Sequence, residues 1–266
     1  DKDKPFLYKK IGKISEGENK FTKLEVPGNI GIAHSRWATT GNVTEENAHP
    51  HVDCHGDIFI VHNGIIENYK ELKGKLLEEG HKFSSETDTE VIAHLIEKFF
   101  DGNLEEAVIK SLKLVKGAYA LAVLSKKDPQ KIVVARNSSP LLIGLGEDEY
   151  IVASDPVAVM SRTKKVIYLE DEEIAVLTPQ SLDITDIHKV PKEKVIKEIE
   201  WDLKEAQKGG YDHFMLKEIM EEPETIENAL RGRLVSGEGL VKLGGLDNVA
   251  KQLKNIDNLI LIGCGT

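Results

Sequence analysis

Residues 58–77 read IFIVHNGIIENYKELKGKLL, and within this stretch a strand pattern changes to a helix pattern. The run Ile58–Val61 is continuously apolar, which is typical of a strand buried on both faces. Apolar side chains then recur at helical spacing, at Tyr69, Leu72, Leu76 and Leu77. Gly80 predicts the end of this helix. The chain is therefore expected to pass from a buried strand directly into a helix.

The segments on either side extend this pattern. Two more helices are predicted, from about Asp88 to Phe100 and from about Leu104 to Val115, because apolar residues repeat there with a helical period. Earlier, residues 1–33 predict short extended pieces that end in the run Ile30–Ala33. Short apolar runs after the helices predict strands, at Tyr119–Leu124, Ile132–Ala135, Leu141–Gly144, Tyr150–Ala153, Val166–Leu169 and Ile174–Leu177. Strands, then helices, then strands imply an α+β protein with two sheets packed together and helices outside.

Beyond residue 190 the composition changes to that of a charged connector. We expect two helices in it, Phe214–Glu221 and Glu224–Leu230, because Pro223 stands where a helix can begin. An amphipathic helix is also predicted around Val249–Leu253.

The last predicted element is the strand Leu259–Ile262, which runs into Gly263-Cys264-Gly265-Thr266. Many phosphate-binding sites begin with a strand that leads into a glycine-rich turn, whose backbone N–H groups and a nearby hydroxyl bind the phosphate. The sequence therefore predicts a domain over 1–190, a connector over 191–245, and the first residues of another domain over 246–266.

The charge balance excludes several classes of function. The 266 residues hold 45 acidic and 35 basic side chains, a net charge of −10. A polyanion is a poor electrostatic partner for nucleic acid or an acidic membrane surface. The longest apolar run, Ala118–Leu124, is too short to cross a membrane. Two cysteines argue against a disulfide framework and favour a reducing compartment, so the cytoplasm is expected.

A metal site is one hypothesis for the histidine-rich segment. Five of the nine histidines stand close together with Asp53 and Cys54, at His34, His49, His51, His55 and His62. Imidazole, thiolate and carboxylate are the usual zinc ligands. However, the segment has no second ligand pair of familiar spacing, so ordinary loop and strand histidines are favoured. We expect no metal and no cofactor.

Three polar signals point to an amino acid ligand. Asn63-Gly64 is either a tight turn or a pair of donors to a developing oxyanion. Thr87 and Glu90 fit a capping box with Asp88 in the first turn, but this carboxylate also suits a ligand ammonium group. Arg36 is either a surface cation–π partner of Trp37 or a clamp for a carboxylate. Together they describe a site for an α-amino acid with a reactive side-chain carbonyl, such as glutamine.

Nine segments resemble the glutaminase domain and following residues of the glutamine–fructose-6-phosphate aminotransferase family. They are HSRWATTG at 34–41, NAHPH at 47–51, VHNGIIEN at 61–68, SETDTEVIAHLI at 85–96, KGAYALAVL at 116–124, SPLLIGLG at 139–146, ASDPVAV at 153–159, HFMLKEIMEEP at 213–223 and LIGCGT at 261–266. The resemblance implies a four-layer αββα sandwich of the N-terminal-nucleophile amidotransferase type. It also implies a helical connector and then the first strand of an α/β sugar isomerase domain.

The resemblance also implies roles for individual residues. Arg36 would bind the α-carboxylate of glutamine and Asp88 its α-ammonium, while Asn63 and Gly64 would form the oxyanion hole. The remaining implied contacts are Trp37, Thr39 and His49 in the glutamine pocket and Thr266 at a sugar phosphate. The complete enzyme would be a homodimer that makes glucosamine 6-phosphate from glutamine and fructose 6-phosphate.

Two positions depart from the family pattern. Thr40 stands where many members have histidine, and residue 1 is Asp where the family has a nucleophilic N-terminal cysteine. We therefore expect the 266 residues to be a truncated fragment that binds glutamine but does not hydrolyse it. Two alternatives stay open: the glutaminase domain of another amidotransferase of the same nucleophile class, and a non-catalytic glutamine-binding module.

Overall fold

The structure is a computed structural model in which two compact units, residues 1–201 and 202–266, are described separately. The described residues are 5–14, 28–38, 40–200, 209–231, 233–235, 240–241, 249–253, 255–258 and 260. The boundary between the units falls inside the expected connector. Thr39, Thr266 and most of the predicted strand 259–262 lie outside the described residues.

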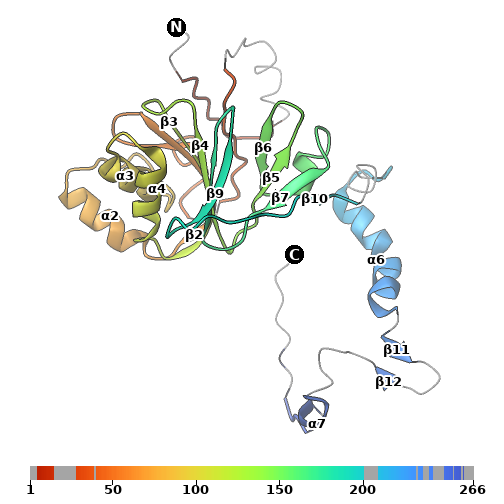
Figure 1. Ribbon diagram of the computed structural model, residues 1–266. Helices are drawn as coiled ribbons and strands as arrows, with labels where there is room; N and C mark the ends of the chain where they lie inside the picture. Colours follow the sequence, from red (N-terminus) through yellow and green to blue (C-terminus); the bar gives the residue numbers. More distant parts are fainter. Residues whose placement is uncertain are drawn as a thin grey trace. The chain divides into compact units, whose positions relative to one another are not determined.

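The first unit contains a six-stranded antiparallel sheet with the order β1-β2-β3-β4-β8-β9 (Figure 1). Its strands are β1 (His51–Val52), β2 (Ile58–Ile66), β3 (Gly117–Ser125), β4 (Ile132–Asn137), β8 (Glu173–Leu177) and β9 (Leu182–Asp186). The predicted strands of this sheet are confirmed, while β1 and β9 were not predicted. In contrast, the run Ile30–Ala33 forms no strand, because its backbone pairs with none of the described strands.

A second, four-stranded sheet has the order β10-β7-β5-β6 and is also antiparallel. Its strands are β5 (Leu142–Leu145), β6 (Tyr150–Ala153), β7 (Lys165–Tyr168) and β10 (Lys197–Glu198). The sequence predicted the first three of these, each within a residue or so. The fourth is a two-residue exposed strand, and it was not predicted.

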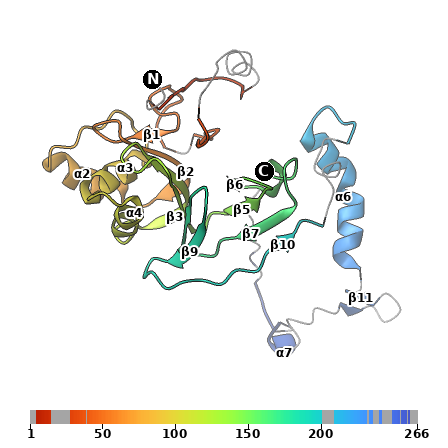
Figure 2. The ribbon, with the colours of Figure 1, turned by 45° about the horizontal axis from the view of Figure 1, so that its top comes forward.

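Three helices, α2 (Tyr69–Glu78), α3 (Glu90–Phe99) and α4 (Leu104–Leu112), lie together beside the six-stranded sheet (Figures 1 and 2). They pack on one face of it through a shared apolar core that includes Ile60, Ile92, Ile96 and Leu104. Each of these four side chains is fully buried. Burial of this kind contributes about 1.5–3 kcal/mol for each large aliphatic side chain.

The opposite face of the six-stranded sheet packs on the four-stranded sheet. Val61, Val134 and Ala175 from the first sheet share a second core with Leu141 and Ile143. The described elements of this unit therefore form three layers, helices, sheet and sheet. The expectation of two sheets packed face to face with helices outside is confirmed, but a second helical layer is not among the described elements.

Strand β2 continues through Asn63 and Gly64 to Ile66 and pairs with β3 along its whole length. The apolar run stops at Val61, so the strand was expected to end near this residue. Pairing with β3 continues past Val61, so that Asn63 lies opposite Ala120 and Gly64 opposite Tyr119. The Asn-Gly pair is therefore not a turn; both residues are part of a central strand.

The second unit holds one long helix, α6 (Phe214–Leu230), with Pro223 inside it. The prediction of two helices that divide at Pro223 is therefore wrong. Proline removes one backbone hydrogen bond and strains the preceding turn, but the helix continues on both sides of it. This unit also contains the strand pair β11 (Leu234–Val235) and β12 (Leu240–Val241), and the short helix α7 (Ala250–Leu253).

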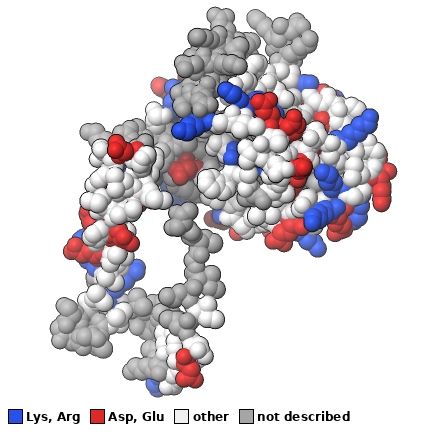
Figure 3. Space-filling model, turned by 180° about the vertical axis from the view of Figure 1, so that it is seen from behind, with Lys and Arg blue, Asp and Glu red and all other residues white. Residues whose placement is uncertain are grey.

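Charged side chains of both signs are mixed over the face of the molecule in Figure 3, without a large basic area. This distribution fits the net charge of −10 and gives a polyanion no basic surface on that face. In the described part of the chain, none of the helices combines the length and the apolar character that a membrane span requires.

Candidate active site

A pocket of about 170 Å³ opens where four segments of the first unit meet. Its residues come from the loop after Gly31, from the segment before β1, from strand β2 and from the turn that leads into α3. They are His34, Ser35, Arg36, Trp37, His49, His62, Asn63, Gly64, Thr87, Asp88 and Thr89. All predicted glutamine-site residues that the structure describes therefore line one cavity.

The Asn63 carboxamide is oriented by a neighbouring imidazole. Nε2 of His34 lies 2.8 Å from Oδ1 of Asn63, and this oxygen can only accept, so Nε2 carries the proton. The amide NH₂ of Asn63 is then the group left to donate toward a ligand. Burial lowers the pKa of His34, which keeps its imidazole neutral in this arrangement.

Gly64 sits where no side chain fits. Its φ is +136°, and a Cβ there would lie 2.0 Å from the carbonyl oxygen of Ala118 on strand β3. An L-residue disfavours this backbone region as well. The glycine thus lets β2 pass close to β3 while its own backbone lines the pocket.

Asp88 presents a buried carboxylate to the pocket. It is 4% exposed, and its Oδ2 accepts a hydrogen bond of 2.7 Å from the backbone N–H of Ile66. Oδ1 has no hydrogen-bond partner among the described residues, so one carboxylate oxygen stays available. A buried carboxylate with an open oxygen is a suitable partner for an ammonium group, because an unpaired buried charge is costly.

The predicted capping box at the start of α3 is wrong. The helix begins at Glu90, and its N-cap Thr89 makes no side-chain capping bond. Instead, the Glu90 carboxylate accepts hydrogen bonds from the backbone and hydroxyl groups of Ser84 and Ser85. Glu90 therefore reaches back by five and six residues rather than three, and this holds the turn that carries Asp88.

Arg36 lines the pocket while its guanidinium holds the following loop. Nη2 donates to the carbonyl oxygens of Thr40, at 2.5 Å, and Gly41, at 3.2 Å, and Nη1 donates to Asn42, at 3.0 Å. Its Nε–H makes no hydrogen bond to a described residue. The cation is therefore positioned at the pocket, with only part of its donor set open to a ligand. Trp37 beside it is 88% exposed.

Three histidines, His34, His49 and His62, line the pocket, and His51 lies behind them against His49. The rings of His34 and His49 stack at 4.1 Å, and His49 meets His51 edge-on at 4.7 Å. Nδ1 of His62 lies 2.9 Å from the hydroxyl of Thr89. Burial lowers the pKa of all four, and that of His51 falls to about 3. These imidazoles are thus neutral and hold the pocket wall through stacking and hydrogen bonds.

The histidine-rich segment divides into two groups. His34, His49 and His62 line the pocket with His51 against His49, whereas the thiol of Cys54 lies near His81 and His94. The residues that line the pocket, as far as the chain is described, include no cysteine.

Sequence reasoning missed the pocket roles of His34 and His62, and of Thr87 and Thr89. The available signal was position, since His34 directly precedes the Arg36 segment and His62 directly precedes Asn63. Their hydrogen bonds, however, join residues that are 27 and 29 positions apart. Local pattern does not specify such pairs.

Comparison with known proteins identifies relatives. A family model described as a glutamine amidotransferase domain matches residues 34–161. The chain is 47% identical over 266 residues to the glutamine–fructose-6-phosphate aminotransferase [isomerizing] of Pyrococcus horikoshii, with 99% of this chain and 43% of that protein covered. It is 44% identical over 255 residues to the protein of the same name from Clostridium acetobutylicum, with 96% and 42% covered.

A solved structure titled as the allosteric regulatory enzyme of purine biosynthesis is also similar. It is 30% identical, covers 58% of this chain and 34% of its own, and has a TM-score of 0.50. The chain spans less than half the length of the curated relatives. Residues 34–161 are thus a glutamine amidotransferase domain, within a chain whose curated relatives are glutamine–fructose-6-phosphate aminotransferases.

Proposed function

We propose that the pocket binds L-glutamine and, in a longer protein that supplies the nucleophilic N-terminal cysteine, positions its side-chain amide for hydrolysis to glutamate and ammonia. In this proposal Arg36 binds the α-carboxylate, Asp88 binds the α-ammonium, and Trp37, Thr39 and His49 complete the wall. The observation that carries the proposal is the presence of a cation, a buried carboxylate and the Asn63-Gly64 pair around one cavity. Opposite charges and hydrogen-bond donors around one pocket match a zwitterion with an amide side chain.

The oxyanion role rests on the hydrogen-bond direction at Asn63. Because His34 donates to Oδ1, the amide NH₂ of Asn63 is free to donate to a carbonyl oxygen that gains negative charge. The backbone N–H of Gly64 is the second donor. Both interactions strengthen as charge develops, so they act on the transition state more than on binding.

We further propose that the ammonia serves amino-sugar synthesis, that is, formation of glucosamine 6-phosphate from fructose 6-phosphate. The names of the relatives support this step, since they are aminotransferases that act on that sugar. In the complete enzyme we propose a four-layer αββα catalytic domain, a sugar isomerase domain that begins near residue 246 with Thr266 at a sugar phosphate, a homodimer and a cytoplasmic location.

Charge-removing variants test the ligand assignment. Arg36→Ala and Asp88→Asn are each expected to weaken glutamine binding by at least tenfold, because removal of one partner of a desolvated charge pair costs about 2–5 kcal/mol. The matched controls are Arg162→Ala and Asp171→Asn, which remove the same charges from exposed surface pairs. Isothermal titration with glutamine measures all four. Unchanged affinity in both pocket variants would refute the assignment.

A further inference from the structure

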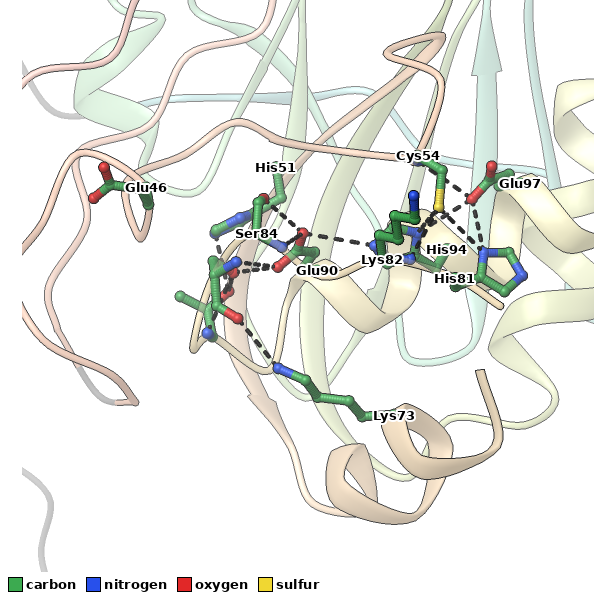
Figure 4. A network of polar contacts seen from close by, with 12 residues as sticks. Glu46, His51, Cys54, Lys73, His81, Lys82, Ser84, Glu90, His94 and Glu97 are labelled. Atoms are coloured by element: carbon green, nitrogen blue, oxygen red, sulfur yellow. Dashed lines mark hydrogen bonds and ion pairs between the residues drawn. The ribbon is translucent and has the colours of Figure 1, made fainter. Parts of the chain in front are cut away.

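A second group of polar side chains lies on the helical side of the sheet, away from the residues that line the glutamine pocket. It joins Cys54, in the turn between β1 and β2, to His81, which follows α2, and to His94 and Glu97 on α3. The thiol lies 3.5 Å from Nδ1 of His94 and 3.7 Å from Nδ1 of His81 (Figure 4). Oε2 of Glu97 lies 2.9 Å from Nδ1 of His81 and 3.1 Å from Nδ1 of His94.

The four atoms converge on one point. All of them lie within 4.8 Å of one another. Bond lengths of about 2.3 Å to sulfur and about 2.0–2.1 Å to nitrogen or oxygen place tetrahedral zinc ligands about 3.3–3.6 Å apart. The sulfur lies 3.5 Å from Nδ1 of His94, within this range, and 3.7 Å from Nδ1 of His81, slightly beyond it. The two nitrogen–oxygen distances are a few tenths of an ångström shorter than the range. A zinc ion therefore requires only small side-chain shifts here.

The outer ring nitrogen of His94 supplies an independent argument. His94 is 0% exposed, and its Nε2 has no hydrogen-bond partner among the described residues. Oε1 of Glu90 lies 3.6 Å from it. A histidine that binds a metal through Nδ1 carries its proton on Nε2 and usually donates it to a carboxylate. The Glu90 carboxylate is placed to accept that hydrogen bond.

Glu97 has a similar outer contact. Its second oxygen, Oε1, lies 3.3 Å from Nε2 of His55. In the part of the chain that the structure describes, neither Glu97 nor Glu90 forms an ion pair with a lysine or an arginine. A divalent cation at this point would balance the charges of the Cys54 thiolate, which it would stabilise, and of the Glu97 carboxylate.

We propose that Cys54, His81, His94 and Glu97 bind one Zn²⁺ ion as a closed structural site. One soft thiolate and two imidazoles favour zinc over magnesium or calcium, which prefer oxygen ligands. The ion would tie the β1–β2 turn to α3, the helix that directly follows the pocket residues Asp88 and Thr89. This revises the expectation of no metal, which considered only ligands close together in the sequence; His81 and His94 are 27 and 40 residues from Cys54.

Cobalt substitution tests the site directly on the 266-residue chain. Protein stripped with a chelator under reducing conditions is titrated with Co²⁺ and then with Zn²⁺. We expect one Co²⁺ per chain, the strong visible bands of a tetrahedral ion, a near-ultraviolet thiolate-to-cobalt band, and displacement by one equivalent of Zn²⁺. Elemental analysis of protein purified without chelator should give one zinc per chain.

Matched variants assign the ligands. Cys54→Ser should abolish the thiolate band, whereas Cys264→Ser, the other cysteine of the chain, should retain it. His81→Ala should weaken zinc binding strongly, and His188→Ala, an exposed histidine of the same unit, should not. Glu90→Gln, at the outer nitrogen, should weaken it about 10- to 100-fold.

Circular dichroism of each apo variant shows whether it is folded, so loss of binding by an unfolded variant is recognised. Absence of bound cobalt in folded wild-type protein would overturn the zinc site. A thiolate band that persists in Cys54→Ser would overturn it equally, because the ligand would then be another residue.

Discussion

Gly64→Ala is expected to destabilise the first unit more than a strained backbone alone can explain. The new Cβ would lie 2.0 Å from the Ala118 carbonyl oxygen, and real Cβ contacts essentially never fall below 3.0 Å. Strands β2 and β3 must therefore separate by about 1 Å at this point. Repulsion between the new Cβ and the Ala118 carbonyl oxygen prevents the strands from keeping their present separation.

The magnitude follows from two costs. A non-glycine residue in a sparsely populated backbone region costs about 1–3 kcal/mol. Separation of the strands weakens about two ladder hydrogen bonds, each worth about 0.5–1.5 kcal/mol. The sum is about 2–6 kcal/mol, a large fraction of the stability of an ordinary domain, about 5–15 kcal/mol.

Two other glycines separate the contributions. Gly80 has a φ of +95° but nothing within 4 Å of a new Cβ, so Gly80→Ala should show the backbone strain alone, about 1–3 kcal/mol. Gly74 lies inside α2 with open space and ordinary φ, so Gly74→Ala should stabilise by about 0.5–1 kcal/mol.

Urea unfolding followed by far-ultraviolet circular dichroism measures all three variants. The expected order of unfolding midpoints is Gly74→Ala, wild type, Gly80→Ala and then Gly64→Ala. A midpoint for Gly64→Ala equal to or above that of Gly80→Ala would show that β2 and β3 do not approach as closely as described.

Three further outcomes are expected. In a longer form of the protein that begins with the N-terminal cysteine of the family and hydrolyses glutamine, Asn63→Ala should lower kcat by about 10²–10³ with little change in glutamine affinity. Steady-state kinetics and titration measure both quantities. A loss of affinity alone would make Asn63 a ground-state contact. In the same form, Cys54→Ser should retain glutaminase activity, since Cys54 does not line the pocket. Loss of activity in a folded variant that still binds glutamine with wild-type affinity would contradict this expectation. The pKa of His51 is lowered to about 3 in the folded protein and is about 6.5 in the unfolded chain. Below pH 6.5 the unfolded chain therefore binds a proton that the folded protein does not, so the free energy of unfolding decreases as the pH falls. His51 should contribute a loss of about 2 kcal/mol between pH 7.5 and 5, and His51→Gln should unfold with a correspondingly weaker pH dependence, which a slope equal to wild type would contradict.

The sequence predicts those elements whose signal is local. The helices around Leu76, Ile92 and Val108 are amphipathic, and their structural bounds lie within a few residues of the expected ones. Strand β9 was missed because Leu182–Asp186 is short and alternates with polar residues, and it becomes a strand by pairing with β8. The break predicted at Pro223 was wrong: proline is common at the start of a helix, but Pro223 lies inside α6.

The candidate site divides in the same way. Arg36, Asn63 and Asp88 could be predicted as candidates because each belongs to a short polar segment next to a predicted strand or helix, and all three line the pocket. Their partners could not be predicted, since the His34–Asn63 contact and the Cys54–His94 contact join residues 29 and 40 positions apart. Contacts at such separations arise from strand register and helix packing, which the sequence pattern alone does not fix.

The most direct test of the glutamine pocket is a comparison of glutamine with two analogues that each lack one charge. Glutaramate lacks the α-ammonium, and 4-aminobutanamide lacks the α-carboxylate. Wild-type protein should bind each at least tenfold more weakly than glutamine. Asp88→Asn should lose its preference for glutamine over glutaramate while it keeps that over 4-aminobutanamide, and Arg36→Ala should show the reverse. Equal binding of all three ligands, or preferences that neither variant changes, would contradict the assignment of Arg36 and Asp88 to the two charges of glutamine.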